Sequence, residues 1–160
     1  MKTRCPIAAV TLLLIAGCIL ALWRVSEGRF LSRLEKAANE ATRSAKPFPY
    51  LTSVTDFAWE RLFIFGPYTP VVEIQRQLGF DWEAAPKTGI NLSDTFCLLV
   101  FVSNGKVVRY FKCPLTIGDF EGLDVQNVFT PEDAVFEVKV RQDNPKWLRF
   151  LSVKSQGDQK

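Results

Sequence analysis

The chain has 160 residues, a net charge of +3 and no histidine, and 48% of its residues are apolar. This length predicts one domain, and 13 phenylalanines favour a folded core over a disordered chain. The lack of histidine excludes Ser-His-Asp and Cys-His nucleophiles and every histidine-ligated metal site. Basic and acidic side chains are interspersed, which argues against a nucleic-acid-binding patch.

The first segment of the chain predicts its location. Lys2 and Arg4 precede an uncharged run that ends at Trp23, so residues 1–23 are predicted to be a signal peptide or a transmembrane anchor. The run Pro6–Trp23 would be about 27 Å long as a helix, at the short end of what spans a bilayer. We therefore expect a protein of a bacterial membrane, with its domain on the extracytoplasmic (periplasmic or outer) face.

Three interpretations of this segment stay open. In the first, Ile15-Ala16-Gly17-Cys18 resembles the lipobox of bacterial lipoproteins, which implies lipidation of Cys18. Residues 19–23 depart from that pattern, because they stay apolar where a mature lipoprotein usually turns polar. In the second, the whole run is an uncleaved transmembrane anchor. In the third, ordinary signal cleavage occurs near Ala21.

Residues 24–46 are predicted to form a helical stalk. Phe30, Leu34 and Ala41 recur at helical spacing, with charged residues on the other faces. The apolar stripe is narrow and consists mostly of alanine, and Pro47 ends the helix. We therefore expect this helix to bury little and to lift the domain off the bilayer. A coiled-coil dimer is the less favoured alternative, because too few heptads carry large apolar residues.

Residues 47–154 are predicted to form the extracytoplasmic domain, and residues 155–160 a disordered tail. The domain begins with Phe57–Phe65, whose alternating pattern predicts a strand with one strongly aromatic face. Thr69 is then a suitable N-cap for a short helix that starts at Pro70 and that a glycine, Gly79, ends.

A hairpin and a further strand complete the predicted domain. Thr95–Val102 and Lys106–Cys113 flank Asn104-Gly105, the strongest short-range hairpin signal in a sequence. Val135–Arg141 alternates like a half-buried strand. The order of elements predicts an α+β fold: a small, mostly antiparallel sheet with one short packed helix, preceded by an N-terminal membrane segment and the stalk.

One run of sequence resembles a known group of proteins. Trp59-Glu60-Arg61-Leu62-Phe63-Ile64-Phe65-Gly66-Pro67-Tyr68-Thr69-Pro70 resembles a motif of small bacterial lipoproteins and membrane-anchored proteins. In that family a Trp-acidic-x-x-aromatic-x-Phe-Gly-Pro-Tyr-Thr strand leads into a short helix that ends near Leu-Gly. The resemblance implies a protein of the bacterial envelope and assigns no activity to it.

Four residues are candidates for a binding site. Trp59, Tyr68 and Trp82 with Arg61 would make an aromatic and cationic contact surface of the kind that anchors protein interfaces. The alternative for Trp59 is packing in the core, since its neighbours along the strand are phenylalanines. Tyr68 has the alternative of stabilising the corner between strand and helix.

Cys97 and Cys113 flank the hairpin, and the geometry of the turn decides whether a disulfide joins them. A two-residue turn at Asn104-Gly105 pairs Phe96 with Cys113 and places the two cysteines on opposite faces of the sheet. A three-residue loop, Asn104 to Lys106, instead places Cys97 opposite Cys113. We expect the two-residue turn and free thiols; the disulfide is the alternative.

These observations predict a membrane-tethered, non-catalytic binding or structural module without a cofactor or metal ion. Its expected partners are membrane lipid and an envelope protein, not nucleic acid. The carboxylate pairs Asp81/Glu83 and Glu132/Asp133 lie in loop-like segments, which argues against acid–base catalysis. One alternative is an immunity or inhibitor protein that binds a toxic enzyme of the envelope. The other is an envelope enzyme that works without histidine.

Overall fold

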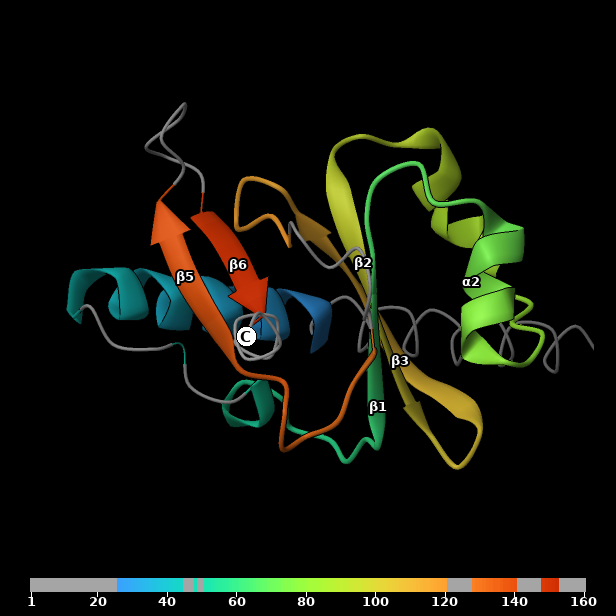
Figure 1. The fold of residues 1–160 in the computed structure, drawn as a ribbon, viewed down its shortest axis with the longest axis horizontal. Coiled ribbons are helices and arrows are strands. Elements are labelled where there is room, and N and C mark those ends of the chain that lie inside the picture. The colour runs from blue at the N-terminus through green and yellow to red at the C-terminus, as the bar shows by residue number, and fades with distance from the viewer. Residues whose placement is uncertain (1–25, 45–47, 49–50, 121–127, 141–147, 153–160) are drawn as a thin grey trace, which may run out of the picture.

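The structure, a computed structural model, describes residues 26–44, 48, 51–120, 128–140 and 148–152. It confirms an α+β fold with mostly antiparallel sheets (Figure 1). The central sheet has the strand order β3-β2-β1-β4, formed by β1 (Arg61–Phe65), β2 (Phe96–Ser103), β3 (Lys106–Pro114) and β4 (Val128–Phe129). A second, two-stranded sheet pairs β5 (Phe136–Val140) with β6 (Leu148–Ser152).

Strand β1 is shorter than the sequence predicts, because it begins at Arg61 instead of Phe57. It lies between β2 and β4, so both of its edges are paired. Both of its faces are covered as well. Leu62 and Ile64 belong to one core and Phe63 and Phe65 to another, which is why the strand reads as a nearly continuous apolar run.

The hairpin of β2 and β3 has the predicted two-residue turn. Asn104 and Gly105 both have positive φ values, 51° and 67°, as a type I′ turn requires. Ser103 pairs with Lys106, and the register then shifts between Phe101 and Val102 through a β-bulge. The bulge, which the sequence pattern does not reveal, changes every pairing between it and the far end of the hairpin.

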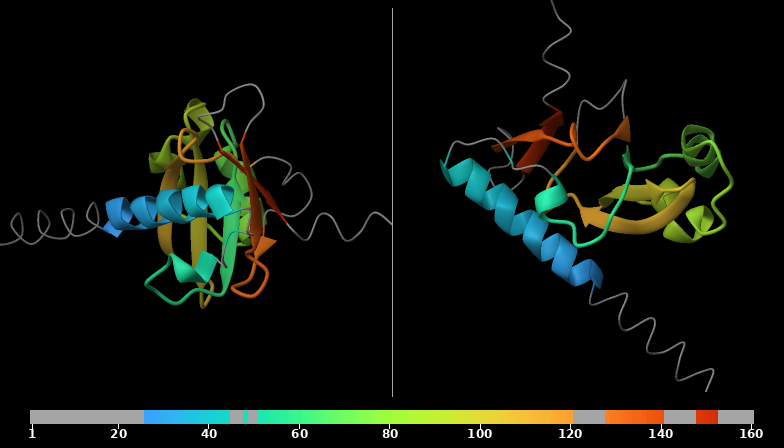
Figure 2. Two further views of the ribbon diagram at one scale, coloured as in Figure 1. Left: turned by 90° about the vertical axis from the view of Figure 1, so that its left-hand side faces the viewer. Right: turned by 90° about the horizontal axis from the view of Figure 1, so that it is seen from below.

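The helix of residues 26–44 packs on the central sheet (Figures 1 and 2). Phe30, Leu34, Ala38 and Ala41 are buried in the larger core, and the ring of Phe30 stacks on that of Phe111 at 4.1 Å. The prediction of a free stalk is therefore wrong for this helix. Its alanines let the helix approach the aromatic face of the sheet closely, so a narrow stripe is sufficient for burial.

Helix α2 (Val71–Leu78) covers the opposite face of the sheet with Ile74 and Leu78. The predicted C-terminal stop is confirmed: Gly79 is left-handed, and its N–H donates to Gln75 O. The predicted N-cap is wrong, because Thr69 Oγ1 instead donates to Gly66 O at 2.7 Å. The segment after α2 contains two 3-10 helices, η2 (Ala85–Thr88) and η3 (Ile90–Leu92). A third, η1 (Leu51–Ser53), precedes β1.

The predicted membrane segment, Pro6–Trp23, lies outside the described residues, as do Cys18 and the tail 155–160. Within the described residues, no helix combines the length and the apolar character that crossing a bilayer requires. The membrane anchor and the lipidation of Cys18 therefore stay predictions.

Candidate functional site

Trp59 is a core residue. Only 6% of its surface is exposed, and its ring meets that of Phe101 edge-on at 5.3 Å. Its indole Nε1 donates a hydrogen bond to Thr55 Oγ1 at 3.3 Å, so its polar atom is satisfied within the protein. The packing alternative is correct for Trp59, and this residue is removed from the binding candidates.

The structure does not bring the four predicted binding residues together. Arg61 is exposed at the start of β1, with its guanidinium 5.4 Å from the centre of the Phe63 ring. Trp82 is half-buried and meets the ring of Tyr110 at 5.1 Å. A combined site of these residues is ruled out, because Trp59 belongs to the core on one face of the sheet and Trp82 packs against the core on the other.

Of the three predicted aromatic binding residues, Tyr68 is the one that is exposed. It has φ 61°, and 59% of its surface is exposed. Thr69 N donates to Gly66 O at 3.4 Å across Pro67, so Tyr68 occupies the third position of a turn, where a positive φ usually calls for glycine or asparagine. Its own N–H donates to Ile90 O at 3.0 Å and to Ser93 O at 3.2 Å. These bonds hold an exposed aromatic ring on a strained backbone.

Two further exposed apolar side chains belong to the segments that adjoin Tyr68. Leu92, in η3, is 82% exposed and belongs to the segment that accepts the hydrogen bonds from Tyr68. Val72, in the first turn of α2, is 72% exposed. Of the five large hydrophobic residues that are exposed in the described part of the chain, these are the three most exposed. We call Tyr68, Val72 and Leu92 the Tyr68 surface; exposed apolar residues on neighbouring segments are candidates for an interaction site.

Neither Val72 nor Leu92 was among the predicted site residues. A signal for Val72 is present in the sequence, because this valine lies off the Val71, Ile74 and Leu78 stripe that predicts the buried face of α2. The exposure of Leu92 has no such signal, since it depends on how η3 folds back toward Tyr68.

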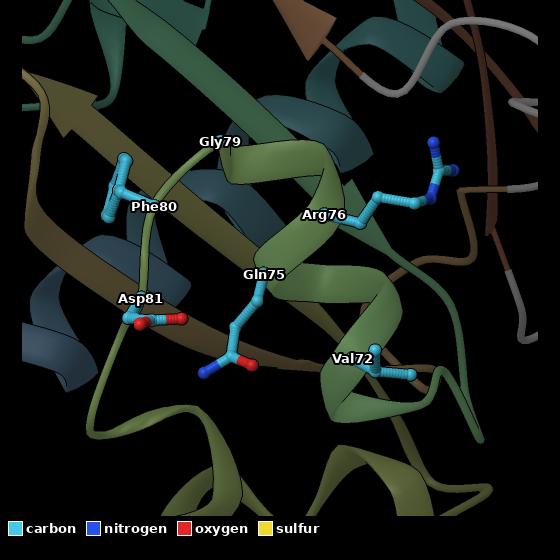
Figure 3. A pocket seen from close by; sticks show the side chains of 6 residues that line it. All are labelled: Val72, Gln75, Arg76, Gly79, Phe80 and Asp81. Atoms are coloured by element: carbon cyan, nitrogen blue, oxygen red, sulfur yellow. The ribbon is translucent and has the colours of Figure 1, made fainter.

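A hollow of about 570 Å³ lies along the outer side of α2 (Figure 3). Its lining combines apolar, polar and charged side chains and is formed by Val72, Gln75, Arg76, Gly79, Phe80 and Asp81. Val72 belongs both to the hollow and to the Tyr68 surface, so the two features adjoin. Gly79 adds no side chain, which leaves the C-terminal end of the helix open to a ligand.

The positive charge beside the hollow, that of Arg76, is paired within α2. Arg76 binds Glu73 through two hydrogen bonds, one of them from Nε at 2.8 Å, and Gln77 donates to the same carboxylate at 2.7 Å. The hydrogen bonds from Arg76 contribute the most, and together with the bond from Gln77 they lower the pKa of Glu73 to about 2. The positive charge of Arg76 is therefore compensated inside α2.

Cys97 and Cys113 lie directly opposite each other in the β2–β3 pair, because the bulge shifts the register. The predicted pairing of Phe96 with Cys113 is wrong, although the predicted two-residue turn is right. Both thiols are free and buried in the larger core, and Cys97 Sγ donates to Asp119 Oδ1 at 3.8 Å. Burial raises the pKa of Cys97 to about 12 and that of Cys113 well above its usual range. Neither thiol is therefore an accessible nucleophile.

The remaining acidic candidates form no cluster in the described residues. No three Cys, Asp or Glu side chains there lie close enough together to hold a metal ion. Of residues 119–127, which include three further acidic residues, the structure describes only Asp119 and Phe120. The best-supported site on the molecule is thus a contact surface, formed by the Tyr68 surface and the hollow beside it.

Comparison with known proteins adds no assignment: no family model, no curated protein and no solved structure matches this chain. The resemblance of the Trp59–Pro70 run to small bacterial lipoproteins stays a prediction.

Proposed function

We propose that this protein is a membrane-tethered, non-catalytic binding module on the extracytoplasmic face of a bacterial membrane, and that the Tyr68 surface contacts an envelope protein. The observation that carries the proposal is the conformation of Tyr68. A side chain that is 59% exposed gains little from folding, yet it is held where the backbone is strained by roughly 1–3 kcal/mol. Such strain is typical of functional positions.

The composition of the surface fits a protein contact. Tyrosine combines an apolar ring with a polar tip and loses little conformational entropy when it binds, and aromatic residues are enriched at interface cores. Val72 and Leu92 would surround it with apolar area that partner binding removes from water. The uncharged run before Trp23 supports the tether, and the lack of histidine and the burial of the Cys97 and Cys113 thiols support a non-catalytic role.

Site-specific photo-crosslinking of the full chain in bacterial cells tests the proposal. A photoreactive amino acid at Leu92 should give one dominant adduct, and the protein should sediment with the membranes. Val140, which is 48% exposed on β5, is the matched control position and should give no such adduct. Recovery of the chain in the soluble fraction would refute the tether. Adducts of equal amount at both positions would refute the assignment of the surface.

A further inference from the structure

The segment that carries the Tyr68 surface differs in charge from the rest of the chain. Residues 66–95 contain four acidic residues and two basic ones, which gives a net charge of −2 against +3 for the whole chain. The acidic residues are Glu73, Asp81, Glu83 and Asp94, and the basic ones are Arg76 and Lys87. Arg61 and Lys112, which lie outside this segment, are on the same face of the sheet, over the rings of Phe63 and Phe96, so the acidic character belongs to the individual carboxylates of the segment. An exposed carboxylate favours a partner group of complementary charge.

Internal ion pairs do not neutralise the acidic side chains of this segment. Glu73 and Arg76 compensate each other. In the part of the chain that the structure describes, Asp81, Glu83 and Asp94 form no ion pair, and all three residues are exposed. Figure 3 shows the side chain of Arg76 pointing away from Asp81, toward the other side of α2. The carboxylate of Asp81 is therefore available at one end of the hollow.

The hollow itself offers two kinds of surface at once. Val72 and Phe80 provide apolar contacts, Gln75 provides an amide, and Asp81 provides a carboxylate. Lysine and arginine side chains match this combination, since their methylene stems pack on apolar surface while the charged head group keeps a polar partner. An acidic or purely apolar side chain would leave Asp81 opposed or without a partner.

We propose that the hollow beside α2 receives a lysine or arginine side chain of the partner protein, whose head group binds Asp81 and whose stem packs on Phe80, which Figure 3 shows on the same side of α2 as Asp81. Glu83 and Asp94 add to the attraction of a basic docking face. The inference rests on the proposed function, because it identifies the partner of the Tyr68 surface as a basic protein. A bilayer is the less suitable occupant, since the carboxylate of Asp81 at the hollow would repel anionic lipid head groups.

The test uses the full chain in nanodiscs of zwitterionic lipid and two fluorescent peptides. One is a 14-residue peptide of leucine, tryptophan and lysine, and in the other glutamate replaces every lysine. Fluorescence anisotropy should show at least tenfold tighter binding of the lysine peptide, with an affinity that falls as salt rises. Asp81→Asn should weaken that binding about tenfold, and Asp81→Lys should reverse the preference between the two peptides.

The matched control is Glu132→Gln, which removes the same charge from an exposed acidic residue outside this segment and should leave the affinity unchanged. Equal affinities for the two peptides, or equal losses in Asp81→Asn and Glu132→Gln, would overturn the inference. The inference would also be overturned if the full chain in these nanodiscs bound anionic vesicles more tightly than zwitterionic ones and Asp81→Lys left that difference unchanged. If the Leu92 adduct forms in cells but does not respond to Asp81→Lys, only this inference fails; if no adduct forms, the proposed function fails.

Discussion

The two faces of the central sheet are covered to different degrees. One face packs against the helix of residues 26–44 and the β5–β6 sheet, and its core includes 21 buried residues among those described. The other face packs against α2 and the 3-10 helices, and its core includes nine buried residues among those described. Figure 2 shows these two coverings on opposite sides of the sheet. The exposed apolar residues Tyr68, Val72 and Leu92 all come from the second covering.

This difference suggests a division of roles. The larger core is dense with ring contacts and closed to solvent, so it contributes most of the hydrophobic stabilisation. The smaller side is built from short elements joined by turns, and such segments adapt to a binding role at little cost to the core. Substitutions on the first side should therefore change stability, and substitutions on the second should change binding.

The largest effect is expected for Phe101→Ala. The Phe101 ring packs against four other aromatic rings, with 5.1–5.9 Å between ring centroids: those of Phe30, Phe57, Trp59 and Phe111. Its removal leaves a cavity between the helix and the sheet and should lower the free energy of unfolding by about 3–5 kcal/mol. Urea denaturation measures the loss.

The matched variant on the other face is Phe65→Ala, whose ring stacks with Phe63 at 6.3 Å. It should cost less than Phe101→Ala, because it leaves the larger ring cluster intact. Equal costs for the two variants would show that the two cores contribute equally and would break the comparison.

A smaller loss is expected for Gly118→Ala. A Cβ atom at Gly118 would lie 2.0 Å from Phe150 Cε2, and that ring is held by Phe48, Phe120 and Phe136. The ring must move, so thermal unfolding should report a destabilisation of about 1–3 kcal/mol. Gly28→Ala is the control within the same side of the molecule, since nothing lies within 4 Å of its Cβ; it should stabilise the helix by about 0.5–1 kcal/mol.

The two buried thiols predict a dependence of stability on pH. The pKa of Cys97 rises from 9.0 to about 12 on folding, because burial disfavours the thiolate. The stability that the neutral thiol contributes is complete below pH 9 and is lost as pH rises toward 12, by about 1 kcal/mol between pH 9 and 10. Urea midpoints at these two values measure this loss together with that from Cys113, whose pKa burial also raises, so Cys97→Ala should reduce the change with pH without abolishing it.

Alkylation tests whether the two thiols are free and buried. Iodoacetamide at pH 8 should leave Cys97 and Cys113 unmodified in the folded protein and modify both after unfolding. If Cys97 and Cys113 stay unmodified in the denatured protein without reductant, the disulfide exists and the expectation of free thiols is wrong.

The smallest change in stability is expected for Tyr68→Asn. Asparagine tolerates a positive φ better than tyrosine, so this variant should be as stable as the parent or up to about 1 kcal/mol more stable. The amount of the Leu92 photo-crosslinked adduct should nevertheless be reduced in this variant, because the aromatic ring is lost. A destabilised variant would show that Tyr68 is a packing residue of the corner, and would remove the main support for the proposed function.

Local patterns were sufficient for the elements that local interactions determine. The turn at Asn104-Gly105, the stop at Gly79 and the approximate limits of β5 are confirmed, because each depends on the backbone preferences of a few adjacent residues. β6 was missed for the opposite reason. Its own pattern is weak, and only its pairing with β5, the strand that precedes it, defines it as a strand.

Tertiary structure decided the rest. The bulge between Phe101 and Val102 placed the two cysteines on the same face of the sheet instead of on opposite faces, and packing on Phe111 turned an expected stalk into part of the core. Tyr68 was predicted as a candidate, but its exposure depends on hydrogen bonds to residues more than twenty positions away. By itself, the sequence determined composition, turns and the apolar N-terminal run. Which apolar residues stay in contact with water was decided only when distant segments packed, because burial depends on what each side chain meets and not on its neighbours along the chain.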